Sequence, residues 1–458
     1  MTTQPPIAAS GLAPDAVAEL RAQLVALLGP EAVRAGEQTL GYRVAARVPP
    51  LAACPSTAQQ VTEILALANE LGAAVVPWGG GTAQALGYPP RAYDLALDVR
   101  GLNRVLAYEP ADLTLSVEAG ISFATLDRLL AEHGQRLPLD CARPEAATLG
   151  GIVAANLAGP RRLRHGTARD LLIGVCAALT DGTLAHGGGR VVKNVSGYDM
   201  MKLFLGSLGT LGVLVELNFK ITPRPAQEVA LALAFDHAEA ALEAVAALLD
   251  SVLQPVALVV LDPVLAADLV AGARGWLLLV GFEGAPAATA RQAREVRART
   301  PAWRGSVVQE REGAAAAALW HAVTAFQAPD DEPRNRALLK VVVPPSEIGA
   351  VLTAVEESAT AAGLHLRRAA DAGTGIVYAR LEQPAVAAAE SFGRALAAVQ
   401  APLLERFGQA VVLSCPAAAK AQVPVWGREP SGIGVMRAIK HQFDPRGILN
   451  PGRFVGGI

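Results

Sequence analysis

Glycines gather in three stretches of the first half of the sequence, and their spacing suggests a ligand held by backbone groups. Gly79, Gly80 and Gly81 directly follow an apolar run, and further glycine-rich stretches occupy residues 148–170 and 187–212. Glycine adopts positive φ and lets a ligand approach main-chain N–H groups, which suit a phosphate or diphosphate. One such loop is most often a tight turn. Three of them together favour one extended, phosphorylated cofactor.

The common motifs for phosphate binding, nucleophilic catalysis and zinc binding are missing. The P-loop pattern GxxxxGK[ST] is absent, and the dinucleotide pattern GxGxxG fails because Gln84 stands where its last glycine should be. Neither the GxSxG elbow of hydrolases nor the HExxH motif occurs. The sequence therefore disfavours a P-loop kinase, a standard nicotinamide domain, a serine hydrolase and a zincin.

Composition and cysteine spacing limit the binding partners and the kinds of metal or disulfide site that the chain can have. The chain has 458 residues, and its formal net charge is −2, from 40 Lys+Arg and 42 Asp+Glu. This balance gives no general attraction to nucleic acid or to an anionic membrane. The four cysteines are far apart and form no CxxC pair, which argues against a disulfide framework, an iron–sulfur cluster or a zinc site.

The N-terminal residues and the apolar runs predict a cytoplasmic protein. The first 15 residues lack a basic region followed by an apolar core, so no signal peptide is predicted. The longest uncharged apolar run is shorter than the ~20 residues that a membrane span needs. Any membrane association would be peripheral, at the inner membrane face and through partners.

The order of helices and strands predicts an α+β fold with two domains and a returning tail. An amphipathic helix is expected over residues 56–72, with Ser56 as its N-cap and Gly72 at its end, followed by a short buried strand. Residues 221–225 mark a boundary. After it, apolar strands and alanine-rich helices alternate, which suits an antiparallel sheet covered by helices on one face. We predict domains at 1–225 and 226–420, and a C-terminal segment at 421–458.

Four ordered motifs resemble one known family. PWGGGT, the stretch PEAATLGGIVAANLAGPRR with HGTARDLLIGV, then VVKNVSGYDMMKLFLGSLGTLGVLVE, and finally FDPRGILNPGRF resemble the FAD-linked oxidases of the vanillyl-alcohol oxidase type. Within that superfamily, whose FAD-binding domain is called PCMH-type, the match is similar to the FAD-binding E subunit of bacterial glycolate oxidase. The resemblance is strong over residues 40–225 and good over residues 405–458.

This resemblance implies a non-covalent FAD between two α+β lobes of the first domain. The loop after the first strand would wrap the diphosphate, the second stretch would follow the ribityl chain, and the tail would close over the flavin. The implied cofactor-binding residues are Pro77, Trp78, Gly79, Gly80, Gly81, Thr82, Thr148, Leu149, Gly150, Gly151, Ala154, Ala155, Asn156, Gly166, Arg169, Asp170, Val175, Gly209, Gly212, Val213, Asn450 and Arg453. Thr82, Ala83 and Gln84 replace the histidine to which relatives often attach the flavin covalently.

The resemblance also allows the catalytic residues of related enzymes to be compared with this sequence. Related D-2-hydroxyacid dehydrogenases carry a metal-binding segment of the type HxGDGNxH. Here Asp371 and Tyr378 stand where its two histidines would be, so no metal site is predicted. The remaining candidates for contact with substrate are Lys340, Tyr378 and Arg380.

The resemblance implies an FAD-containing subunit of a glycolate oxidase or dehydrogenase complex, which oxidises a 2-hydroxy acid to a 2-oxo acid. The expected partners are a D-like FAD subunit and an iron–sulfur subunit, because this chain has no cluster ligands of its own. Two alternatives stay open. The chain could be a non-catalytic FAD module for electron relay or assembly, or a stand-alone FAD-dependent D-2-hydroxyacid dehydrogenase.

Overall fold

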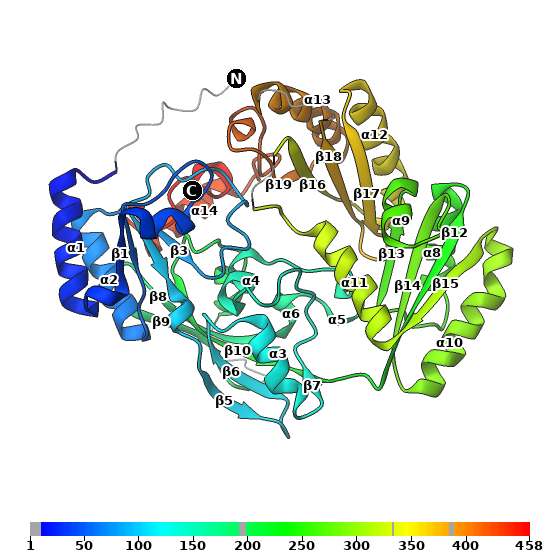
Figure 1. Ribbon diagram of the computed structural model, residues 1–458, viewed down its shortest axis with the longest axis horizontal. Helices are drawn as coiled ribbons and strands as arrows, with labels where there is room; N and C mark the ends of the chain where they lie inside the picture. Colours follow the sequence, from blue (N-terminus) through cyan, green and yellow to red (C-terminus); the bar gives the residue numbers. More distant parts are fainter. Residues whose placement is uncertain (1–10, 192–197, 332–333, 384–388) are drawn as a thin grey trace.

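The computed structural model describes residues 11–191, 198–331, 334–383 and 389–458. It consists of an N-terminal body with two sheets and a second body built on one eight-stranded sheet, and the chain end returns to the first body (Figure 1). This mixture of helices and sheets confirms the α+β expectation.

The first sheet of the N-terminal body has the order β1-β2-β4-β3 and pairs its last three strands in parallel. Its elements are β1 (Val33–Ala35), β2 (Leu51–Ala53), β4 (Leu95–Asp98) and β3 (Val75–Trp78), covered by α1 (Pro14–Leu28) and α2 (Ala58–Leu71). Helix α2 buries the apolar face that its 3.6-residue period predicts. The predicted N-cap was wrong: Thr57 rather than Ser56 accepts from the Gln60 N–H, and Gly72 ends the helix at φ 71°.

The second sheet is antiparallel and has the order β5-β6-β10-β8-β9. Its strands are β5 (Val105–Glu109), β6 (Thr114–Glu118), β10 (Val213–Lys220), β8 (Leu172–Ala178) and β9 (Leu184–Gly188). Helices α3 (Phe123–Ala131) and α4 (Leu149–Ala155) bury their apolar residues against it. Short elements complete this body: β7 (Gln135–Arg136), α5 (Arg162–His165), α6 (Ala168–Leu171), α7 (Met201–Phe204) and β11 (Thr222–Pro223).

The second body, called the cap here, is an eight-stranded antiparallel sheet in the order β15-β12-β14-β13-β17-β18-β16-β19. Its strands are β12 (Gln227–Phe235), β13 (Ala257–Leu261), β14 (Trp276–Gly284), β15 (Ser306–Glu312), β16 (Arg336–Val342), β17 (His365–Asp371), β18 (Ile376–Glu382) and β19 (Ala410–Ser414). The antiparallel sheet was predicted. The domain limits at 225 and 420 stay a prediction.

Helices cover both faces of the cap sheet, so the expectation of one covered face was wrong. One face packs against α8 (Ala238–Leu249), α10 (Pro286–Arg299), α12 (Ile348–Ala361) and α13 (Ala389–Phe407). The other face carries α9 (Pro263–Leu269) and α11 (Gly313–Gln327). Figure 1 shows α11, in yellow, running between the cap sheet and the N-terminal body. No helix of the described residues is long and apolar enough to cross a bilayer.

The returning tail and a buried ion cluster are two of the connections between the bodies. The tail after α14 (Ile433–Phe443) returns to the first sheet, where Leu449 pairs with Val75. A buried ion cluster joins the bodies elsewhere: Arg136 and His165 both contact Glu283 of the cap, and Arg161 bonds Glu228 at 3.1 Å. Buried charges need such partners, so this cluster fixes the angle at which the bodies meet.

Candidate functional site

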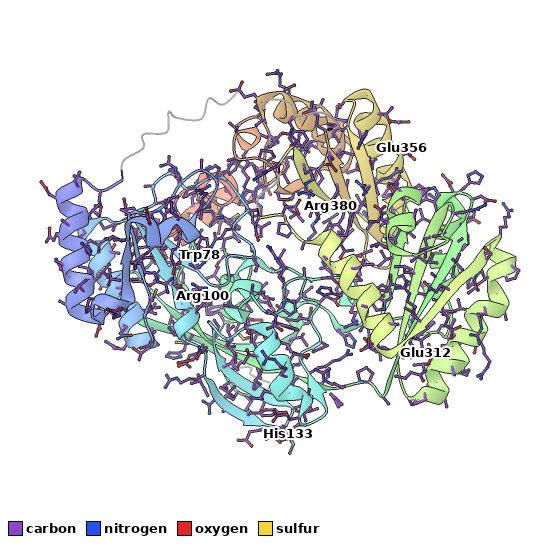
Figure 2. The ribbon with its side chains drawn as sticks, viewed as in Figure 1. Trp78, Arg100, His133, Glu312, Glu356 and Arg380 are labelled. Atoms are coloured by element: carbon purple, nitrogen blue, oxygen red, sulfur yellow. The ribbon has the colours of Figure 1, made fainter. Side chains whose placement is uncertain are left out.

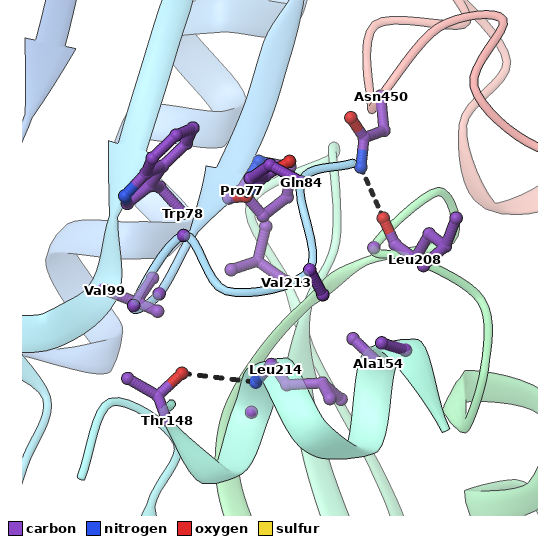
Figure 3. A pocket seen from close by; sticks show the side chains of 18 of the residues that line it. Pro77, Trp78, Gln84, Val99, Thr148, Ala154, Leu208, Val213, Leu214 and Asn450 are labelled. Atoms are coloured by element: carbon purple, nitrogen blue, oxygen red, sulfur yellow. Dashed lines mark hydrogen bonds between the residues drawn. The ribbon is translucent and has the colours of Figure 1, made fainter. Parts of the chain in front are cut away.

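A cleft of about 710 Å³ opens between the glycine loop after β3 and helix α4. Figure 3 shows the loop above the cleft, α4 below it and Asn450 of the tail at one end. Small side chains predominate in its lining, which brings backbone close to any ligand. Of the predicted cofactor residues, those that line it are Pro77, Trp78, Gly79, Gly80, Gly81, Thr82, Thr148, Gly150, Gly151, Ala154, Ala155, Gly209, Gly212, Val213, Asn450 and Arg453.

The glycine loop is shaped by a close approach of two backbone segments. An added Cβ at Gly80 would lie 1.7 Å from the carbonyl oxygen of Ala146. The space beside Gly80 is thus filled by the protein itself and not by the anion that the sequence suggested. Gly81 has φ 72°, a conformation that other residues rarely adopt. Within the described chain, no backbone carbonyl accepts a hydrogen bond from the N–H groups of residues 79–83. These donors are therefore available to a ligand.

Helix α4 begins beneath that loop. The Thr148 hydroxyl accepts from the Gly151 N–H at 3.3 Å, as an N-cap does (Figure 3). Gly150 sits so close to β6 that its N–H donates to the Ala119 carbonyl at 2.7 Å. A larger residue at Gly150 would push α4 away from its sheet, because an added Cβ there would lie 2.9 Å from the Ala119 carbonyl oxygen.

The tail closes the far end of the cleft. The Asn450 N–H donates to the Val75 carbonyl at 2.8 Å, and its side chain donates to the Leu208 carbonyl. Arg453 is 3% exposed and donates to the carbonyls of Gln84 and Leu86. Asn450 and Arg453 therefore tie the C-terminal segment to the loops that form the cleft walls.

Six predicted cofactor residues lie outside the cleft lining, and their roles stay predictions. They have structural contacts instead: Leu149 and Val175 are buried in the second sheet's core, and Asn156 ends α4 at φ 48°. Gly166, Arg169 and Asp170 lie around α6, where Asp170 completes a capping box with Thr167. Of the KNVSGYD motif at 193–199, residues 193–197 lie outside the described residues.

Sequence reasoning missed five residues that line the cleft. They are Ala83, Gln84, Val99, Leu208 and Leu214. Ala83 and Gln84 directly follow the predicted loop, so a longer loop limit would have included them. Val99, Leu208 and Leu214 carry no chemical signal, because they contribute apolar surface that only the fold brings together.

A second cleft of about 550 Å³ continues from the first toward the cap. Thr82, Ala83 and Gly151 line both clefts, and Asp140 and Gln327 line the second. Helix α11 of the cap forms one wall through Gln327. A molecule in this space would therefore touch both bodies at once.

Next to Gln327, the cap sheet presents a buried group of charged and polar side chains, called the polar group here. Gln327 Nε2 donates to Asp371 Oδ1 at 2.6 Å, while Oδ2 of Asp371 is buried without a partner among the described residues. Lys340 on β16 lies directly opposite Tyr378 on β18. Arg162 reaches the group from α5 of the N-terminal body and acts on the charges of Lys340, Asp371 and Tyr378.

Burial shifts the acid–base behaviour of the polar group. Burial raises the pKa of Asp371 to about 7, although the hydrogen bond from Gln327 and the charge of Arg162 oppose the shift. Burial and the charge of Arg162 lower the pKa of Lys340 to about 8. Burial also raises the pKa of Tyr378, so its phenol stays protonated. Perturbed groups of this kind mark candidate functional sites.

The predicted catalytic residues separate in the structure. Lys340 and Tyr378 belong to the polar group. Arg380, labelled in Figure 2, donates instead to the carbonyls of Phe326 and Ala328 and to Asp330, and so anchors the end of α11. Sequence reasoning missed Arg162 and Gln327. Within the described part of the chain, no three His, Cys, Asp or Glu side chains are placed to share a metal ion.

Comparisons with known proteins agree on the family and the cofactor. The family model for an FAD binding domain matches residues 49–188, and the model for the C-terminal domain of FAD linked oxidases matches residues 224–393 and 419–454. Among solved structures, p-cresol methylhydroxylase with substrate bound has a TM-score of 0.76 over 97% of each chain. At 17% identity this likeness shows the fold alone.

Two curated relatives are subunits of glycolate oxidase. Subunit GlcD of Bacillus subtilis (strain 168) is 27% identical over 461 residues, which cover 95% of this chain and 96% of that protein. Subunit GlcE of Escherichia coli (strain K12) is 41% identical over 138 residues, which cover 30% of this chain and 39% of that protein.

The cofactor of this chain is FAD, and the first cleft fits it. The N–H groups of residues 79–83 are donors without carbonyl partners in the described chain, as a diphosphate requires. Non-covalent attachment stays a prediction. It agrees with Thr82, Ala83 and Gln84 in the loop and with Cys141, whose thiol pKa burial raises to about 11.

Proposed function

This chain belongs to the superfamily of FAD-linked oxidases, and we propose that it oxidises a 2-hydroxy acid to the corresponding 2-oxo acid. The glycolate oxidase relatives support this substrate class, because glycolate is the simplest 2-hydroxy acid. The second cleft supports it as well, since it adjoins the FAD cleft and is lined by Gln327, the hydrogen-bond partner of Asp371.

The observation that carries the proposal is a pair of cations that lie near Asp371 but form no close salt bridge among the described residues. Lys340 and Arg162 form no salt bridge of 4.0 Å or less with any described carboxylate, although both lie near Asp371. Both side chains are half-buried, and a cation removed from water is costly unless an anion pairs with it. A substrate carboxylate would supply that anion, and a planar guanidinium can hold it through two hydrogen bonds.

Asp371 is the proposed proton acceptor. Its Oδ2 lacks a donor among the described residues and is shielded from water, so the substrate hydroxyl would supply the missing hydrogen bond. As the carbonyl forms, the hydroxyl proton passes to Oδ2. Bound FAD supplies the acceptor for the hydrogen and electron pair of the α-carbon. Gln327 holds the other carboxylate oxygen and so orients Asp371.

We further propose that the chain works in a complex as an E-type subunit, with a D-like FAD subunit and an iron–sulfur subunit that receives the electrons. The replacement of both motif histidines by Asp371 and Tyr378 supports the E assignment, as does the local match to GlcE. The end-to-end match to GlcD means that length does not separate the two subunit types.

Anaerobic mixing of the purified FAD-loaded chain with single hydroxy acids tests the function. We expect glycolate, D-lactate or D-2-hydroxyglutarate to bleach the flavin absorbance in the absence of partners. L-Lactate and a non-hydroxylated acid such as propionate serve as controls. If every 2-hydroxy acid leaves a full complement of FAD oxidised, the catalytic proposal is wrong. Stable association with a D-like subunit would then favour the electron-relay alternative.

A further inference from the structure

Two buried cations hold the loop that follows the three glycines. Lys420 is 4% exposed, and its Nζ donates to the carbonyls of Ala85 at 2.6 Å and Gly87 at 2.7 Å. Arg453 donates to the carbonyls of Gln84 at 2.7 Å and Leu86 at 2.9 Å. The carbonyls of four successive residues, 84–87, therefore point to two positive charges.

Neither cation has a counter-ion among the described residues, since no carboxylate lies within 4.0 Å of Lys420 or Arg453. A second lysine shows the contrast: Lys440, whose side chain is 11% exposed, donates to the carbonyls of Thr210 and Leu449, but it also pairs with the carboxylate of Asp444. The fold thus compensates one of these lysines and leaves the other uncompensated.

The lack of a counter-ion is accompanied by lowered pKa values of both cations. Burial lowers the pKa of Lys420 to about 8; the nearby Cys415 thiol opposes this shift, and the charge of Arg453 adds to it. Burial lowers the pKa of Arg453 to about 10, with only Tyr93 acting against it. A bound anion would stabilise the charged form of both groups.

The position of the two cations identifies that anion by its chemistry. Arg453 lines the FAD cleft itself, and Lys420 holds the loop whose earlier N–H groups, at residues 79–83, lack carbonyl partners. The diphosphate of FAD carries two negative charges and must lie among such donors. Two uncompensated positive charges behind the loop would balance it.

We propose that Lys420 and Arg453 supply the positive charge that the FAD diphosphate neutralises, and that Lys420 acts as a positioning residue for cofactor affinity. Lys420 does not line the cleft; it acts through the loop and through its charge. It lies in the turn Ala419–Ala421, directly after the last cap strand, so the cap end of the chain contributes to FAD binding. This inference holds whichever substrate is oxidised.

The test distinguishes a role of the Lys420 charge from a role of its hydrogen bonds to the loop. Apoprotein of the full chain is titrated with FAD, and its melting temperature is measured, for the wild type, Lys420→Gln and Lys420→Arg. We expect Lys420→Gln to bind FAD at least about tenfold more weakly near pH 7, a loss typical of one partly buried charge interaction. Its apoprotein should melt at the same or a higher temperature, because an uncompensated charge is removed. Lys440→Gln is the matched control, and its apoprotein should melt lower because Asp444 loses its partner.

The pH dependence gives a second measurement. Lys420 loses its proton above about pH 8 in the apoprotein, and the bound diphosphate would raise its pKa again. Wild-type affinity for FAD should therefore fall about tenfold from about pH 7.5 to about pH 9.5. The guanidinium of Lys420→Arg stays charged, so that variant should show no fall in this range.

The proposal is overturned if Lys420→Gln binds FAD like the wild type, or if its apoprotein melting temperature falls together with its affinity. Equal pH slopes for the wild type and Lys420→Arg would also overturn it. If Lys420→Gln does not fold, the comparison between the wild type and Lys420→Arg decides alone.

Discussion

The FAD cleft and the polar group of the cap differ in the groups that they offer to an anion. The cleft uses backbone N–H groups on a glycine loop, and its cations, Lys420 and Arg453, lie behind carbonyl groups. The polar group uses side chains directly, with Lys340 and Arg162 close to the acid Asp371. The first arrangement suits a cofactor that stays bound. The second mixes charges whose pKa values lie near neutrality, which suits a group that exchanges a proton in every turnover.

This contrast predicts that the cleft is sensitive to the smallest change in its backbone. Gly80→Ala places a Cβ 1.7 Å from the Ala146 carbonyl oxygen, so the loop must separate from that segment. We expect purified protein with less than about a tenth of the normal FAD content, because a shift of ~1 Å in the binding groups is costly. The ratio of flavin absorbance to protein absorbance measures the content. Gly41→Ala, where nothing lies within 4 Å, is the control and should retain FAD. Normal FAD content in Gly80→Ala would contradict the role assigned to this loop.

The polar group should respond to the loss of one proton acceptor without losing the cofactor. Asp371→Asn keeps the shape and the hydrogen bond to Gln327 but removes the base. We expect kcat/KM for the hydroxy acid to fall by about 10²–10⁴, the usual contribution of a general base. FAD content should be unchanged. Gln327→Glu is a matched probe of the neighbouring wall, since a second acid beside Asp371 should raise the pKa of the pair. A variant Asp371→Asn with normal kcat/KM would remove Asp371 from the mechanism.

The two halves of the site also differ in how far the sequence predicts them. The backbone site could be predicted, because a glycine loop and a TLGG turn are continuous motifs whose function depends on small residues. Asp371 and Tyr378 were found through the spacing of a family motif, and Lys340 was found through the family resemblance of its strand. Arg162 and Gln327 were not, since only the packing of α5 and α11 brings them to the cap sheet.

Lys420 is another residue whose role could not be predicted from the sequence. It stands in an alanine-rich stretch, AAAKAQ, which resembles an ordinary surface turn. Only its burial and the two carbonyls of a loop over 300 residues away in the chain reveal a role. The helix at 56–72 followed from periodicity, and the alternation of apolar and alanine-rich segments indicated the strands and helices of the cap. The second covered face of the cap sheet did not, because an alanine-rich helix such as α11 gives little indication of what it packs against.

The pH profile of kcat/KM tests two members of the polar group in one measurement. Asp371 must be ionised to accept a proton, so kcat/KM should rise as the pH increases through about 7. Lys340 must be charged to hold a carboxylate, so kcat/KM should fall as the pH increases through about 8. The expected curve is a narrow bell. In Asp371→Asn the acidic limb should disappear while the alkaline limb remains. If the acidic limb persists in Asp371→Asn, a group other than Asp371 causes it.

The substrate cations should affect binding more than turnover. Lys340→Met removes one of the two proposed carboxylate partners, so KM should rise about 10- to 100-fold, as expected for one charge-assisted hydrogen bond. The kcat value at saturation and the FAD content should change little. Steady-state kinetics with glycolate or D-lactate measures both constants. Arg380→Met is the comparison variant, because Arg380 anchors α11 and should affect stability more than KM. A larger KM effect from Arg380→Met would reverse the assignment of the two residues.

The ion cluster between the bodies should give the smallest effect, confined to stability. Burial alone would raise the pKa of Glu283, but hydrogen bonds from His165 and Arg136 and the nearby arginine charges outweigh it and lower the pKa to about 2. A depressed carboxyl pKa stabilises the folded state above about pH 4.5, and this contribution is lost as the pH falls toward 2.

Glu283→Gln should therefore lower the free energy of unfolding by about 3 kcal/mol near neutral pH, because Arg136 and Arg161 lose a buried partner. Glu295→Gln, on an exposed helix pair with Arg291, is the control and should cost less than about 0.5 kcal/mol. Denaturant unfolding at pH 7 and pH 4 measures both differences. If the two variants prove equally stable at pH 7, the bodies are held together by the returning tail and by apolar contacts, and the cluster contributes specificity of angle without net stability.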